Sequence, residues 1–189
     1  MRRSQFALLM PSLLVLAACG TAPEQRTAPV PSVPAVSTAK LAEANLAPAS
    51  ASIVSGRLAL VPDARGVHIT GTIGGLQPLQ TAAFHVHERG DCSAVDASSA
   101  GGHFNPANQP HGRNSAGAHH AGDMDNLRAD AQGRVSVDVR LPGVTLGGGA
   151  ATDIVGRALV VHANADDYRS QPAGNAGARI ACGVIRVTR

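Results

Sequence analysis

Short runs in which apolar and polar residues alternate dominate the chain from residue 51 onward. The run GVHITGTIGG (66–75) sets Val67, Ile69 and Ile73 against histidine and threonine, and RVSVDVRL (134–141) repeats the pattern. A period of two gives a strand one buried and one exposed face. Similar runs span 53–62, 157–163 and 179–187, and AQGR (131–134) indicates a hairpin turn. No long segment carries a helical stripe, so the sequence predicts an all-β domain, an antiparallel sandwich or flattened barrel of seven or eight strands.

One long stretch, about 89–128, interrupts these runs and lacks strand character. Loops of that length inside a compact domain are usually functional or held by a cross-link. Cys92 and several histidines in this stretch could supply such a link. We therefore expect this loop to carry the chemistry of the protein.

The N-terminus has the pattern of an export signal. MRRSQFALLMPSLLVLAAC combines a basic start, a short apolar run and small residues before Cys19. An ordinary signal peptide cut after small residues is one interpretation. The other rests on Leu16-Ala17-Ala18-Cys19, which resembles the lipobox of bacterial lipoproteins, so 1–18 is removed and Cys19 is lipidated. We expect an exported, periplasmic protein anchored to a membrane of the cell envelope, and Gly20 after the cysteine favours the outer membrane.

Residues 19–50 are rich in alanine, proline, serine and threonine, with prolines at 23, 29, 31, 34 and 48. This composition predicts a disordered tether that holds the folded domain, 51–189, away from the membrane. A short helix near 41–45 is an option within it.

The overall charge gives no basis for a nucleic-acid partner. The formal net charge is +3, but Arg2 and Arg3 lie in the predicted signal peptide. Removing them leaves 16 − 2 = 14 basic residues against 13 acidic ones, or about +1. No cluster of basic residues stands out, so binding to nucleic acid is not expected.

Two cysteines remain once Cys19 is assigned to lipid. In an oxidising compartment Cys92 and Cys182 are expected to pair, and two separate buried thiols are the alternative. A bridge closing about 90 residues would stabilise the fold by roughly 4–5 kcal/mol in the chain-entropy treatment.

Seven of the eight histidines fall between residues 85 and 162. His85 and His87 stand two apart on a predicted strand, so both rings project from one face. His162 stands in another apolar run, and the long loop carries His103, His111, His120 and Asp123. Six imidazoles and a carboxylate exceed the needs of one ion and indicate two metals. Imidazoles suit zinc, copper, iron and nickel, and the single carboxylate fits zinc better than copper.

A cupin-type metal site also begins with the pattern His-x-His. It needs a glutamate a few residues further on, whereas Glu88 directly follows His87. That alternative also leaves the loop histidines and both cysteines without a role.

The stretches FHVHERGDC, AGGHFNP, GRALVVHANADD and GNAGARIACGVI occur together with loop spacings of eight, nine and three residues. Together they make 51–189 resemble copper/zinc superoxide dismutase, in its bacterial branch. The resemblance implies a Greek-key fold with long metal-binding loops. It implies copper on His85, His87, His103 and His162, zinc on His103, His111, His120 and Asp123, a carboxylate at Asp166 linking the two sets, an arginine beside copper at Arg179, and a Cys92–Cys182 disulfide. His68 and His119 are left over and are expected to be solvated.

The same resemblance implies the reaction. Copper would alternate between two oxidation states, converting superoxide to oxygen and hydrogen peroxide, while His103 takes up a proton and Arg179 attracts the anion. The segment DDYRSQPAGNAG (166–177) departs from the eukaryotic enzymes because it is short and carries no lysine or glutamate. Steering then rests on Arg179, with Arg169 as a second candidate. Such an enzyme would protect the cell envelope from superoxide.

One alternative function stays open. A lipoprotein that stores or delivers copper without catalysis could use the same fold. The sequence also does not choose between a monomer and a homodimer.

Overall fold

The computed structural model describes residues 35–189, so the predicted signal peptide and Cys19 lie outside the described residues. In this part of the chain the only helix is a 3-10 turn at Ser98–Ala100, and nothing there could span a membrane as a helix. The predicted all-β class is confirmed.

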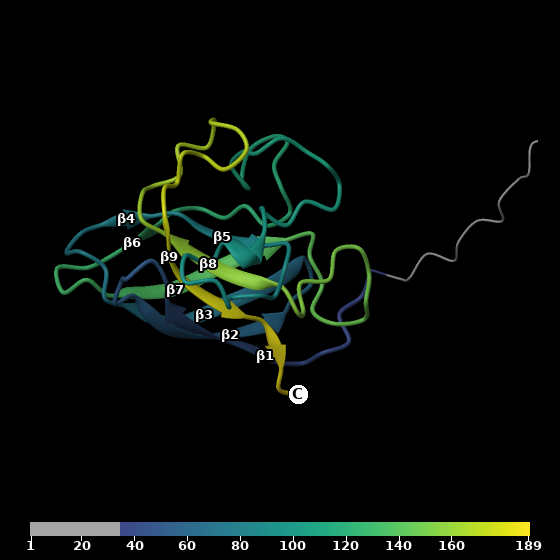
Figure 1. Cartoon of the computed structure of the whole chain (residues 1–189). Coiled ribbons are helices and arrows are strands. Elements are labelled where there is room, and N and C mark those ends of the chain that lie inside the picture. The colour runs from purple at the N-terminus through teal and green to yellow at the C-terminus, as the bar shows by residue number, and fades with distance from the viewer. Residues whose placement is uncertain (1–34) are drawn as a thin grey trace, which may run out of the picture. The chain divides into compact units, whose positions relative to one another are not determined.

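One antiparallel sheet curls around the core (Figure 1). Its strands are β1 (Ala42–Pro48), β2 (Ser55–Pro62), β3 (Gly66–Gly74), β5 (Phe84–His87), β7 (Val135–Pro142), β8 (Ala158–His162), β9 (Arg179–Val184) and β10 (Arg186–Val187). The order across the sheet is β5-β8-β9-β1-β2-β3-β7, and β10 pairs with β1. A separate two-stranded pair joins β4 (Thr81–Ala82) and β6 (Leu127–Arg128).

The predicted alternation sets the inner face of this sheet. On β3, Val67, Ile69 and Ile73 are buried, whereas the threonines between them are half-buried or exposed. β7 pairs along the whole of β3, which places Val139 opposite Ile69. Burying one apolar face per strand is the main source of stability for such a fold.

β1 corrects the predicted boundary of the tether. Residues 42–48 were expected to be disordered or helical, but they form a strand between β2 and β9. Ala42, Ala44 and Leu46 face the core. Alanine, glutamate and leucine favour helix locally, and pairing with two neighbouring strands overrides that preference. The folded domain therefore begins before residue 51.

Two long loops lie side by side over one end of the sheet (Figure 1). The first follows β5, spans 88–126 and is drawn in teal. The second connects β8 to β9, spans 163–178 and is drawn in yellow-green. The side chain of Asn126 bonds the backbone N–H and C=O of Asp166, which joins the two loops. Together they cover β5, β8 and β9.

We expect a chain that begins at residue 51 to lose cooperative folding. Removing β1 exposes the unpaired backbone groups of β2 and β9 in the middle of the sheet. A chain that begins at residue 35 keeps β1 and serves as the control. Thermal unfolding followed by circular dichroism measures both, and equal midpoints would contradict the role of β1.

Candidate metal centre

Strands β5 and β8 supply three buried histidines. His85 and His87 on β5 are 0% and 1% exposed, and His162 at the end of β8 is 3% exposed. β5 and β8 pair in antiparallel register, and His162 pairs with Arg179 of β9 next to an irregularity in the ladder. The expected common face of His85 and His87 is therefore built into the sheet.

The first loop adds ligands by pairing with β5. The backbone of His103 lies opposite His87, and that of Asp123 lies opposite His85. The amide of Phe104 donates to the carbonyl of Val86 at 2.8 Å, which continues the ladder. The sheet thus positions two of the loop ligands, His103 and Asp123, beside its own.

The four histidines predicted for copper meet in one cluster. Ligand atoms of His85, His87, His103 and His162 all lie within 4.8 Å of one another. His87 Nδ1 donates to the carbonyl of Gly101 at 2.9 Å, and His162 Nδ1 lies 3.4 Å from the carbonyl of Gly177. With hydrogen on Nδ1, the Nε2 atom of each ring carries a lone pair and no hydrogen. The two Nε2 atoms nevertheless lie only 3.2 Å apart.

Buried nitrogens without partners show that this cluster suits a cation. In residues 35–189, three buried side-chain nitrogens have no hydrogen-bond partner: His85 Nδ1, His103 Nε2 and His111 Nδ1. The first two point into the all-imidazole cluster. Converging lone pairs are costly unless a metal ion accepts them. Four imidazole nitrogens form a donor set that suits copper.

The second cluster joins His103, His111, His120 and Asp123, whose ligand atoms also lie within 4.8 Å of one another. Asp123 Oδ1 lies 2.8 Å, 3.1 Å and 3.3 Å from the Nδ1 atoms of His103, His111 and His120. No hydrogen bond is formed to His111 Nδ1 despite the short distance. Three imidazoles and one carboxylate around a point form a typical zinc site. His103 belongs to both clusters and offers each a different ring nitrogen.

Asp166 connects the two clusters from behind. Its Oδ2 accepts a hydrogen bond from His85 Nε2 at 2.8 Å, and its Oδ1 accepts one from His111 Nε2 at 2.9 Å. Both rings then present Nδ1 as the free ligand atom. Gly174 packs against this contact with φ +65°, and a Cβ there would lie 1.8 Å from Asp166 Oδ1 and 2.7 Å from His111 Nε2.

Electrostatics differ between the two clusters. Burial lowers the pKa of His87 to about 2 and that of His162 to about 3, and neighbouring imidazoles add to the effect. Both rings are therefore neutral and can offer a nitrogen lone pair to a metal ion. Burial opposes protonation of His111 as well, but Asp123 and Asp166 outweigh it and raise its pKa to about 9. Two carboxylates thus stabilise positive charge at the second cluster: its own Asp123, and Asp166, which bonds His111 from outside the cluster.

The contacts that raise the pKa of His111 lower the pKa of Asp123. Burial would raise the pKa of this carboxyl, yet the imidazoles of His103, His111 and His120 hold it well below its usual range. An ionised carboxylate at this depth requires cationic or hydrogen-bonding partners. Asp123 is therefore suited to bind a metal ion.

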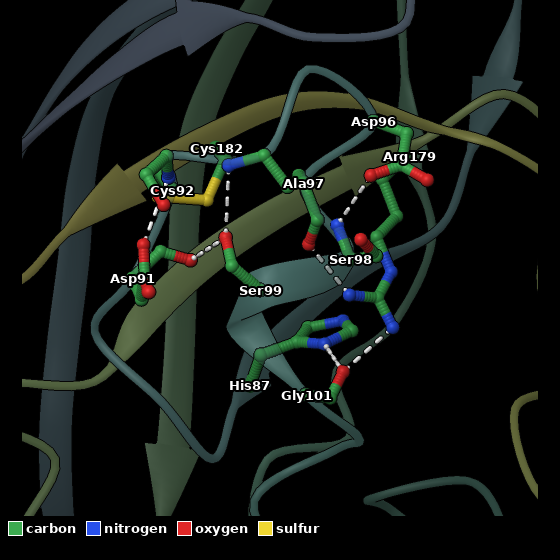
Figure 2. The surroundings of a disulfide bond; sticks show 12 residues. His87, Asp91, Cys92, Asp96, Ala97, Ser98, Ser99, Gly101, Arg179 and Cys182 are labelled. Atoms are coloured by element: carbon green, nitrogen blue, oxygen red, sulfur yellow. Dashed lines mark hydrogen bonds between the residues drawn. A yellow bond between two sulfur atoms is a disulfide. The ribbon is translucent and has the colours of Figure 1, made fainter.

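The Cys92–Cys182 disulfide forms as expected, with Cα atoms 5.7 Å apart. It joins the start of the first loop to β9 (Figure 2). Arg179 Nη1 donates to the carbonyl of Ala97 at 2.7 Å, and Nη2 donates to the carbonyl of Gly101 at 2.6 Å. Because Gly101 also accepts from His87, the segment fixed by the disulfide aligns both a copper-type ligand and the arginine.

A surface cleft opens over the all-imidazole cluster. Its walls include three of the four clustered histidines, Arg179 and neutral residues 170–177 of the second loop. Apart from histidines, the charged residues lining it are Arg179 and Glu88. Arg169 does not line the cleft. The cleft wall formed by the second loop is therefore uncharged, because Asp166, Asp167 and Arg169 of this loop do not line it.

Other residues predicted or missed by sequence reasoning can now be placed. Neither His68 nor His119 joins a cluster: His68 pairs with Asp138 at 2.6 Å, and half-buried His119 contacts the carbonyl of His120. Sequence reasoning missed Asn126 and Gly174, whose roles depend on contacts between the two loops. A glycine in a loop is a weak signal by itself.

Comparisons with known proteins agree with this geometry. The sequence profile of the family "Copper/zinc superoxide dismutase (SODC)" matches residues 54–185. The chain is 48% identical to "Superoxide dismutase [Cu-Zn] 2" of Aquifex aeolicus over 136 residues, which is 70% of this chain and 80% of the relative. It is 40% identical to "Superoxide dismutase [Cu-Zn]" of Caulobacter vibrioides over 137 residues, 70% of this chain and 78% of the relative.

Solved structures give the same result. A crystal structure of a SOD-like protein from Bacillus subtilis matches with a TM-score of 0.69 and 38% sequence identity, covering 75% of this chain and 96% of that one. An all-β fold with two histidine clusters that share one imidazole defines a two-metal oxidoreductase of the copper and zinc type. The chain belongs to the copper/zinc superoxide dismutase family. The predicted enzyme class and the two cofactors are confirmed.

We expect Gly174→Ala to weaken zinc binding about tenfold or more, because the new Cβ would separate Asp166 from His111. Gly149→Ala is the matched control, since Gly149 has φ +71° and open space around its Cβ position. Both variants carry similar backbone strain. Zinc content after dialysis against a zinc buffer is measured by plasma mass spectrometry. Equal loss of zinc from the two variants would contradict this role.

Proposed function

We propose that this chain dismutes superoxide at the paired clusters and does so outside the cytoplasm, protecting the cell envelope. The reaction converts two superoxide anions and two protons into oxygen and hydrogen peroxide. The observation that carries the proposal is the pair of complete donor sets that share His103, together with a cleft lined by His103, His87, His162 and Arg179.

In this proposal His85, His87, His103 and His162 bind copper, and His103, His111, His120 and Asp123 bind zinc. Copper, when bound, exchanges one electron with each superoxide in turn. The other functions belong to residues of the chain. Asp166 and the carbonyl of Gly101 hold the tautomers of His85 and His87. His103 Nε2, which has no protein partner, is the atom that holds a proton during turnover.

Arg179 docks the substrate anion. Its guanidinium is half-buried at the cleft, and two carbonyls orient it without neutralising its charge. Arginine stays protonated even when burial lowers its pKa, as it does here. Because Glu88 is the other charged residue besides histidines in the lining, attraction of an anion rests mainly on Arg179.

We expect Arg179→Ala to lower kcat/KM about ten- to a hundredfold at low ionic strength. Metal content should not change, because Gly101 still accepts the hydrogen bond from His87. A xanthine-oxidase assay of metal-loaded protein measures the rate, with Arg134→Ala in the distant hairpin as control. A rate equal to wild type would refute the docking role. Wild-type activity no higher than that of free copper would instead favour copper storage or delivery.

The N-terminal sequence supports the proposed cellular location. The pattern Leu16-Ala17-Ala18-Cys19 supports lipidation of Cys19 after removal of 1–18. Several acyl chains on one cysteine anchor a protein stably. Under this proposal the anchor holds the enzyme at an envelope membrane, and superoxide reaches the cleft from the extracytoplasmic side.

We expect Cys19→Ser to move the protein from the membrane fraction to the soluble fraction of lysed cells. Incorporation of labelled palmitate should disappear in the same variant. Cys92→Ser, which leaves the N-terminus intact, is the control and should remain in the membrane fraction. Membrane association of Cys19→Ser equal to wild type would contradict the lipid anchor.

A further inference from the structure

The side-chain amide of Gln171 bonds to the backbone of His111 on both sides of its Cα. Gln171 Oε1 accepts from the His111 N–H at 2.8 Å, and Gln171 Nε2 donates to the His111 carbonyl at 2.9 Å. The two residues are 60 positions apart and belong to different loops. One side chain thus satisfies both backbone groups of a buried metal-type ligand.

This arrangement differs from that of the other ligands. His85, His87 and His162 lie on strands, and His103 and Asp123 pair with β5. In residues 35–189, no backbone–backbone hydrogen bond involves His111. The carbonyl of His120 at least closes a turn with the amide of Asp123. Within residues 35–189, His111 is therefore the metal-type ligand whose backbone N–H and C=O are both bonded by one side chain.

The ring of His111 is held from the same loop as its backbone. Its Nε2 donates to Asp166, five residues before Gln171. With the backbone held by Gln171 and the far nitrogen held by Asp166, the remaining Nδ1 points toward Asp123 Oδ1 at 3.1 Å. Three fixed points determine both the position and the orientation of one imidazole.

Gln171 and His111 differ in their exposure to solvent. His111 is 4% exposed, whereas Gln171 is exposed and lines the cleft. Removing the Gln171 amide at the surface lets water reach the freed backbone groups, so the cost to the fold is small. The main effect falls on how precisely His111 is placed.

We propose that Gln171 is a positioning residue for the zinc ion, acting through His111 and leaving the copper ligands unaffected. The inference rests on the proposed assignment of zinc to the cluster that contains His111. The copper ligands other than shared His103 lie on strands, so loss of the Gln171 amide does not reach them. The second loop would thereby serve the zinc site with the same segment that forms a wall of the cleft.

The test compares metal affinities of full-chain variants. Zinc affinity is measured by competition with a chromophoric chelator, and copper affinity is measured in the same way with zinc in excess. Gln171→Ala should bind zinc about tenfold more weakly. Its copper affinity should stay within about twofold of wild type, since no copper ligand loses a partner.

Two further variants separate hydrogen bonding from bulk. Gln171→Met keeps the size of the side chain but lacks both polar groups, so it should lose zinc affinity as Gln171→Ala does. Gln132→Ala, on the exposed 131–134 hairpin, should match wild type. The thermal midpoints of the metal-free variants provide a check that the fold itself is intact.

Three outcomes would overturn the inference: unchanged zinc affinity in Gln171→Ala, wild-type zinc affinity in Gln171→Met, or an equal loss of both metals. Equal loss would indicate general loosening of the loops. A wild-type chain that bound no zinc would instead refute the proposed zinc site, before any variant is compared.

Discussion

The structure of the metal centre depends on one carboxylate that joins two imidazoles. Asp166 receives a hydrogen bond from His85 on one oxygen and from His111 on the other. These rings belong to different clusters, and one comes from a strand while the other comes from a loop. The ionised carboxylate can remain buried because both imidazoles and the backbone N–H of Tyr168 donate to it. The hydrogen bonds to the two rings in turn fix which nitrogen each ring offers to a metal. The features around it, the Asn126 bonds and the missing side chain at Gly174, keep this contact in place.

The cleft is organised by a second, independent set of contacts. The carbonyl of Gly101 accepts hydrogen bonds from both His87 and Arg179. The same oxygen atom therefore positions a metal ligand and the anion-attracting guanidinium. Figure 2 shows how the Cys92–Cys182 bridge brings this segment against β9. The disulfide therefore acts on the substrate side of the centre, whereas Asp166 acts on the side remote from it. The first loop, through Gly101, therefore orders the substrate side of the centre, and the second loop, through Asp166, orders the opposite side.

The sequence predicted the strands because alternation is a short-range pattern. It also singled out the histidines and Asp123 by their number and spacing, whereas their division into a copper set and a zinc set came from the resemblance to a known family. Alternation along β3 and β7, and the spacing of His103, His111, His120 and Asp123, are visible without any knowledge of pairing. β1 escaped prediction because its buried face consists mostly of alanine, whose alternation carries little contrast. Asn126 and Gln171 escaped for a different reason: each acts on a residue 40 or 60 positions away, and an amide in a loop has no periodicity that would reveal its partner.

The position of β1 also has a consequence for the order of folding. This strand is synthesised before every other strand described, yet its partners β9 and β10 are the last. Such long-range pairing makes folding slow compared with a sheet of neighbouring hairpins. The sheet cannot be completed while the C-terminal strands are still being made, so β1 lacks its partners on one side until β9 and β10 have been synthesised. Synthesis of the last strands therefore completes the sheet that carries His85, His87 and His162.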